Sequence, residues 1–116
     1  MQRDIAHLLD MLDSAQLIRN YVADRSREEF LSQVGFQDQV IRRFEIIGEA
    51  ARRVSEQMRK ELPTVPWHEM IGLRNILIHD YGEVNLEQLW DIIQIDLPSL
   101  IRTIEPLIPP PSESPY

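Results

Sequence analysis

Residues 74–82 place an arginine, an amide, an imidazole and a phenol close together at the end of an otherwise apolar segment. Arg74 carries a planar fork of donors that matches the oxygens of a phosphate group. Histidine changes its charge near neutral pH, which makes His79 the candidate proton carrier. Asn75 stands one helical turn before His79, so it can orient the imidazole or bind a phosphate oxygen. Together these residue types predict chemistry on a phosphodiester.

Cleavage of RNA without a metal ion has three requirements that such residues meet. The 2′-hydroxyl must lose a proton, the 5′-oxygen must gain one, and the charge that develops on the phosphoryl oxygens must be stabilised. His79 can move protons, and Arg74 can neutralise the charge. One such histidine per chain is too few for two proton transfers, so we expect a two-fold homodimer that brings two copies together.

Helix geometry limits how Arg74 and His79 can act together. In one continuous helix they point about 140° apart, because each residue turns the helix by about 100°. We therefore expect either that Arg74 bends back or that the helix unwinds near His79. The alternative is that both residues only neutralise the C-terminus of an apolar helix, and that Asp80 only starts the turn before Gly82.

The elements that must position these residues are all predicted to be helices. Apolar residues recur at three- and four-residue steps, and no strand-like alternation extends beyond a few residues. Ser26 with Glu29 has the spacing of a capping box, and Pro98 should kink or part the last helix. The predicted fold is all-α, a small up-and-down bundle of about five helices, at residues 3–22, 26–33, 37–62, 66–79 and 85–107.

The third predicted helix has an apolar seam on one side and a charged stripe on the other. Gly48 lies in its middle at a cost of about 1 kcal/mol against alanine, which a close helix crossing would explain. We interpret the stripe as a solvated face with ion pairs, the alternative being that Glu45 or Glu49 meets a partner chain. His7, beside the apolar side of the first helix, is assigned to the surface or its boundary. The stripe consists of Arg42, Glu45, Glu49, Arg52 and Glu56, and the seam of Val40, Phe44, Ile47, Ala51, Val54 and Met58.

Length and cysteine content restrict the class of protein. The 116 residues suit a helical domain at 1–105 followed by a flexible Pro-rich tail at 106–116. The absence of cysteine excludes disulfides, zinc–thiolate sites and thiol nucleophiles. No apolar run approaches the roughly 20 residues of a membrane span, and the first residues lack the apolar core of a signal peptide. We expect a soluble cytoplasmic protein that has no membrane partner.

The charge of the chain argues against a general nucleic-acid coat, which would be basic. The net charge is −7 and the pI is about 4.9. This does not exclude a local cationic cleft that acts on RNA. Apart from Lys60, every basic residue is an arginine, the better residue for bidentate phosphate contacts.

A larger set of residues resembles the HepT-like members of the HEPN superfamily. The mark of that group is an arginine, four to six residues, a histidine, any residue and a tyrosine. Here Arg74, His79, Asp80 and Tyr81 match it without departure. The similarity also covers residues 46–51 and 86–97. The residues around the motif that carry the resemblance are Pro66, Trp67, Ile71, Gly72, Asn75, Leu77 and Ile78.

The resemblance implies a fold, an activity and a partner. Members of the group are helical bundles that dimerise with the motif of both subunits lining a cleft, and they are RNase toxins that need no metal or cofactor. For this chain it implies catalysis by Arg74 and His79, with Asn75 and Asp80 in support, RNA as the substrate and no DNA. It also implies a type VII-like toxin–antitoxin module. There a minimal nucleotidyltransferase of the MntA type transfers AMP from ATP to Tyr81 and silences the toxin.

Two other interpretations stay open from the sequence. The chain can be a non-catalytic subunit that binds a nucleotidyltransferase and helps to hold its nucleotide or substrate, with Arg74 binding phosphate and no proton transfer. It can also be a helical dimerisation module whose motif only caps a helix. RNase assays on the purified protein, with and without EDTA, separate these interpretations from the toxin.

Overall fold

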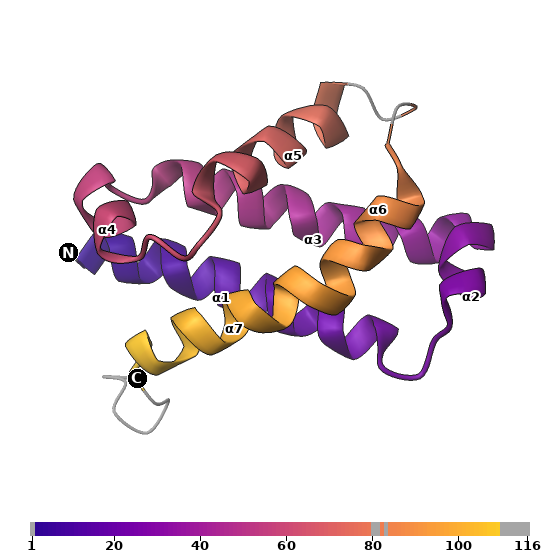
Figure 1. Ribbon diagram of the computed structural model, residues 1–116, viewed down its shortest axis with the longest axis horizontal. Coiled ribbons are helices and arrows are strands. Elements are labelled where there is room, and N and C mark those ends of the chain that lie inside the picture. The colour runs from indigo at the N-terminus through magenta and orange to yellow at the C-terminus, as the bar shows by residue number, and fades with distance from the viewer. Residues whose placement is uncertain (1, 80–81, 83, 110–116) are drawn as a thin grey trace.

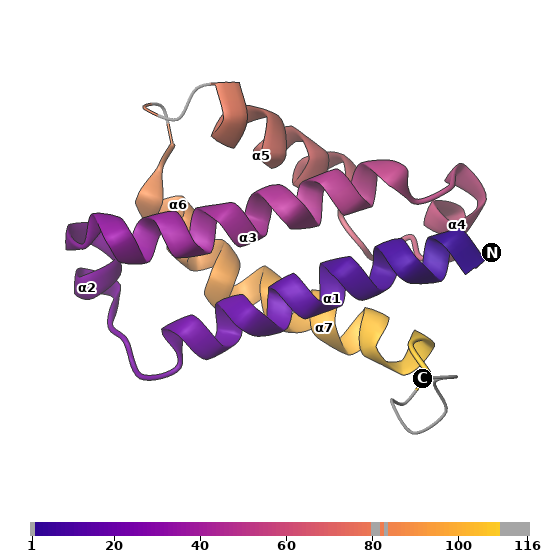
Figure 2. The same cartoon turned by 180° about the vertical axis from the view of Figure 1, so that it is seen from behind.

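The protein is an all-helical bundle, seen here in a computed structural model that describes residues 2–79, 82 and 84–109 (Figure 1). No strand occurs in these residues, which confirms the predicted all-α class. α1 and α3 pack side by side, α5 packs on α3, and α7 packs on α1 (Figure 2). The helices are α1 (Gln2–Val22), α2 (Arg27–Ser32), α3 (Val34–Arg53), α4 (Glu56–Glu61), α5 (Trp67–His79), α6 (Leu86–Asp91) and α7 (Leu97–Ile104), with a π-turn η2 (Ile92–Asp96) and a 3₁₀ turn η3 (Glu105–Leu107).

The core lies where the apolar sides of α1, α3 and α7 meet. Complete burial of one large aliphatic or aromatic side chain stabilises the fold by about 1.5–3 kcal/mol. The predicted seam of α3 is buried from Val40 to Val54, and Met58 beyond it is partly buried. The buried side chains of α1 and α7 that complete this core are Leu8, Met11, Leu12, Ala15, Ile18, Leu97, Leu100, Ile101 and Ile104.

The predicted single helix at 37–62 is wrong, because the chain leaves helical geometry at Val54 and starts α4 two residues later. Ser55 caps α4 by accepting a hydrogen bond from Met58 N at 3.1 Å. Asp4 of α1 accepts hydrogen bonds from Ser55 N at 2.8 Å and from Ser55 Oγ at 2.7 Å. A contact across 51 residues therefore holds the break, and no local signal predicted it.

The last predicted helix is divided as Pro98 suggested. Pro98 has no N–H to donate and its ring crowds the preceding turn. The backbone accommodates it with the wider turn η2, in which Leu97 N–H donates to Ile92 O. At its start, Asn85 caps α6 by accepting a hydrogen bond from Gln88 N at 3.0 Å. The structure describes the Pro-rich stretch as far as Pro109, and residues 110–116 lie outside the described residues.

The capping box at the start of α2 is confirmed. Ser26 Oγ accepts a hydrogen bond from Glu29 N, and Glu29 Oε1 accepts one from Ser26 N, both at 3.1 Å.

None of the described helices has the length and apolar composition that a bilayer crossing requires.

Candidate active site

The site begins at the crossing of α3 and α5, where Gly48 faces Arg74. A Cβ at Gly48 would overlap Arg74 Cβ and would lie 2.9 Å from Met70 O. This close approach is the helix crossing that the glycine predicted. It sets the base of the Arg74 side chain directly against α3, next to Glu49. Arg74 Nη2 then forms an ion pair with Glu49 Oε2 at 3.0 Å.

Glu49 is the centre of a charge cluster. Besides its ion pair with Arg74, it accepts hydrogen bonds from Arg52 Nη2 at 2.9 Å and from Arg53 Nε at 3.1 Å, both at its Oε1. The hydrogen bond from Arg52 is the main reason that the pKa of Glu49 is lowered, although burial of the carboxylate acts the other way. Glu49 therefore stays ionised and holds Arg74 by charge.

The Arg74 guanidinium is not fully satisfied by these contacts. Its Nη1 donates to Asn75 Oδ1 at 3.1 Å, whereas its Nε is buried without a hydrogen-bond partner in the described part of the chain. Asn75 thus contacts the neighbouring arginine, and the structure places no hydrogen bond between Asn75 and His79 among the described contacts. A buried charged donor that lacks an acceptor is costly in a folded protein unless a ligand or water completes it.

Arg74 lines a polar groove between α1, α3 and α5 with a volume of about 300 Å³. We call it the polar groove. His7 lies in its α1 wall, half-buried, which agrees with its assignment to the boundary. The charged side chains that line it are Arg42, Arg53 and Arg74, opposed by Asp10, Glu45 and Glu49.

Part of the charged stripe on α3 therefore lines the polar groove. The interpretation of the stripe as a solvated face was to that extent incomplete. The interpretation is right for the ion pairs themselves, because Arg42 pairs with Glu45 and Arg52 with Glu49. The role of Glu49 toward Arg74 was not predicted. The sequence did contain one indication of this role, which is the position of Gly48 directly before Glu49. A glycine that lets another helix approach closely also brings that helix near the residue beside the glycine.

His79 does not join Arg74 within one chain. α5 continues without unwinding to His79, its last residue, so the two side chains leave the helix about 140° apart. His79 is exposed, and Ile78, not His79, lines the polar groove. Of the two alternatives that the sequence left open, unwinding of the helix is not observed as far as His79. Asp80 and Tyr81 lie outside the described residues.

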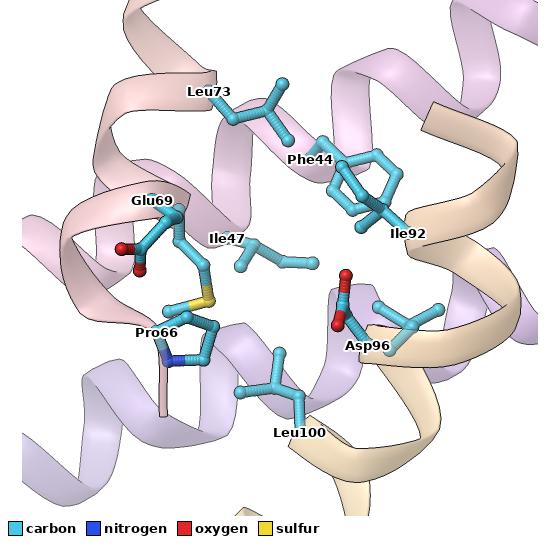
Figure 3. A pocket seen from close by; sticks show the side chains of 10 residues that line it. Phe44, Ile47, Pro66, Glu69, Leu73, Ile92, Asp96 and Leu100 are labelled. Atoms are coloured by element: carbon cyan, nitrogen blue, oxygen red, sulfur yellow. The ribbon is translucent and has the colours of Figure 1, made fainter. Parts of the chain in front are cut away.

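A second cavity separates α5 from η2 and α7, and it has the opposite character (Figure 3). Its volume is about 240 Å³ and its wall is apolar. Among its lining residues the charged ones are Glu69 and Asp96, both acidic. An anionic substrate is repelled there, so the polar groove is the better candidate for phosphate. The apolar lining consists of Phe44, Ile47, Pro66, Met70, Leu73, Ile92, Leu97 and Leu100.

Arg74 therefore lines a polar groove, and His79 ends the same helix on another side. The family model described as Ribonuclease HepT-like matches residues 11–107, and the chain belongs to this family. The family assignment agrees with the resemblance drawn from Arg74, His79 and Tyr81.

Individual relatives cover nearly the same part of the chain. A protein of Methanocaldococcus jannaschii named "Putative RNase MJ1380" is 41% identical over 90% of this chain and 96% of its own length. Another from that organism, "Putative RNase MJ0127", is 39% identical over 89% of this chain and 85% of its own. "Probable ribonuclease HepT" of Thermococcus cleftensis is 36% identical over 87% and 92%. No solved structure gives a significant match.

Proposed function

We propose that this protein is a metal-independent endoribonuclease and the toxin of a type VII-like toxin–antitoxin module. The observation that carries the proposal is the ion pair of Arg74 with Glu49, which holds a guanidinium in the polar groove of a HepT-like chain. RNA is the substrate. Arg74 and His79 are the catalytic residues, and Asn75 and Asp80 support them.

The reaction follows from the chemistry of the two side chains. A neutral imidazole takes the proton of the RNA 2′-hydroxyl as that oxygen forms a bond to phosphorus. The bond from phosphorus to the 5′-oxygen breaks, and a protonated imidazole gives that oxygen its proton. Arg74 offsets the charge that builds on the phosphoryl oxygens. The products are a 2′,3′-cyclic phosphate and a 5′-hydroxyl, and the two histidines come from two copies of His79.

A homodimer supplies the second histidine and also covers the exposed side of α5. Ile76 and Ile78 of α5 are 47% and 45% exposed, although helices with apolar residues on every side are ordinarily buried. Because Arg74 and His79 diverge within one chain, a partner packed near the end of α5 is the arrangement that would bring a His79 toward each Arg74. Symmetric association of two copies is the commonest form of protein oligomer.

Regulation by a nucleotidyltransferase partner of the MntA type acts at Tyr81. Addition of AMP there places phosphate charge seven residues after Arg74 in the sequence. The modified tyrosine would then occupy the position of the RNA phosphate. Incubation with the partner enzyme and ATP should add AMP units that Tyr81→Phe prevents, as mass spectrometry measures. An unchanged mass of the wild-type chain contradicts this part of the proposal.

Cleavage of single-stranded RNA in EDTA tests the central claim. Arg74→Ala and His79→Ala should each lower the rate about 100-fold or more, the usual contribution of a charge-stabilising or proton-transfer group. His68→Ala is the matched control, because His68 is exposed on the first turn of the same helix. Circular dichroism and sedimentation establish that each variant is folded and associates as the wild type does. A folded His79→Ala variant that still cleaves RNA overturns the assignment.

The divergence of Arg74 and His79 within one chain also favours a second candidate. In a non-catalytic subunit of a nucleotidyltransferase, Arg74 would bind a phosphate of the nucleotide without any proton transfer. That candidate predicts that the purified protein cleaves no RNA with or without EDTA. It also predicts that Arg74→Ala, but not His79→Ala, weakens nucleotide binding in the presence of the partner enzyme.

A further inference from the structure

We propose that Arg42 is a second phosphate-binding residue, so that the polar groove holds the RNA backbone beyond the cleaved bond. The inference rests on the proposed ribonuclease function and adds to it a residue of the substrate-binding surface. It concerns binding alone, because Arg42 has no part in proton transfer.

Arg42 lies on the side of α3 that lines the polar groove. Arg42 and Arg74 line the same groove, although they come from α3 and α5. Arg42 stands seven residues before Glu49, which is about two turns and about 10 Å along the helix. It therefore lies on the same side of α3 as the carboxylate that holds Arg74. A strand of RNA bound at Arg74 and running along α3 passes Arg42.

Arg42 is accessible to a phosphate group from solvent. Its side chain is 66% exposed, and its guanidinium lies 3.5 Å from the carboxylate of Glu45, whose side chain is 21% exposed. A long ion pair whose arginine is exposed to solvent is screened by water and contributes little to stability. A phosphate can form two parallel, charge-assisted hydrogen bonds with the guanidinium fork, and these are stronger than one long contact. Arg42 can thus exchange Glu45 for a phosphate at small cost.

The third guanidinium of the groove is less free. Arg53 donates to Glu49 at 3.1 Å, and Glu49 also holds Arg52 and Arg74. Release of Arg53 would disturb the cluster that positions Arg74, whereas release of Arg42 leaves it intact. Arg42 is therefore the residue of the groove best suited to bind an additional phosphate.

The salt dependence of RNA binding tests this inference. Binding of a single-stranded RNA oligonucleotide is measured in the His79→Ala background, so that cleavage does not interfere. Loss of one phosphate contact lowers the slope of log K against log salt by about 0.7 for single strands. Arg42→Gln should therefore show this smaller slope together with about tenfold weaker binding at low salt.

Two variants keep the test specific. Arg102→Gln removes the same charge from an exposed position on α7, and both its slope and its affinity should equal those of the parent. Arg42→Lys keeps the charge but loses the fork, so it should retain the slope while binding less tightly. Equal slopes for Arg42→Gln and the parent overturn the inference while leaving the ribonuclease intact. If the parent binds no RNA and the wild type cleaves none, the proposed function fails as well.

Discussion

Arg74 of α5 and Glu49 of α3 form a 3.0 Å ion pair directly beside the point where Gly48 lets the two helices touch. The glycine and the carboxylate are neighbours in sequence, and each contributes differently to the position of Arg74. Gly48 removes the side chain that would keep α5 away, and Glu49 supplies the charge that directs the guanidinium. The candidate phosphate site is therefore a property of one helix crossing.

Gly48→Ala should destabilise the protein and impair the site. Its Cβ would overlap Arg74 Cβ and crowd the carbonyl of Met70, and overpacking of this kind costs about 1–3 kcal/mol. Urea denaturation measures the free energy of unfolding, and RNA cleavage should fall with it. Gly72→Ala is the control, since its Cβ meets no atom within 4 Å of the described structure and alanine favours a helix. Equal stability of the two variants would refute the crossing.

Glu49→Gln should lower kcat for RNA cleavage about tenfold while changing KM little. The amide removes the charge that directs Arg74 but keeps the shape of the side chain, so the loss falls on the transition state. Glu49→Asp should restore part of the rate, because a carboxylate is again present. Glu61→Gln, an exposed change on α4, should leave kcat unchanged. An unaltered rate for Glu49→Gln would show that Arg74 needs no positioning.

Asp4→Ala should destabilise the fold by about 1–3 kcal/mol at neutral pH, because it removes two part-buried hydrogen bonds that the Asp4 carboxylate accepts from Ser55. The hydrogen bond from Ser55 N is the main reason that the pKa of Asp4 is lowered. A lowered pKa means that this stability is fully present above the ordinary value of 3.8 and is lost as pH falls further.

Urea denaturation at neutral pH and near pH 3 measures this pH dependence. The difference between the wild type and Asp4→Ala should shrink at the lower pH. Asp24→Ala, at an exposed turn, provides the baseline. A difference that stays constant with pH would contradict the assignment of stability to the Asp4 carboxylate.

Mixed dimers of one wild-type and one His79→Ala subunit should cleave RNA about 100-fold or more slowly than the wild-type dimer, because two proton transfers need two histidines. Each mixed dimer keeps both copies of Arg74 but only one His79, so that the base and the acid of the proposed reaction cannot both be present. Co-expression with two affinity tags isolates the mixed species, and cleavage in EDTA measures its activity. A mixed dimer that keeps half of the wild-type activity would show that one subunit supplies a complete site with a single His79.

The amino-acid sequence by itself determined the helical class and several helix ends. Ser26 and Glu29 cap α2 through hydrogen bonds within three residues, and Pro98 changes the helix type because it lacks an N–H group. The buried seam of α3 follows from periodicity alone. These features depend on neighbours within about one helical turn, so the pattern of residues is sufficient to predict them. The motif of Arg74 and His79 likewise pointed to the family.

Only the tertiary structure decided where the site lies and what completes it. Asp4 accepts a hydrogen bond from Ser55, 51 residues away, at the break in the predicted long helix. Glu49 of α3 forms an ion pair with Arg74 of α5. The side chains of His79 and Arg74 point in different directions, because α5 stays helical to its end. Such contacts join residues that are distant in sequence, and their energies depend on how whole helices pack. No local pattern in the chain contains that information.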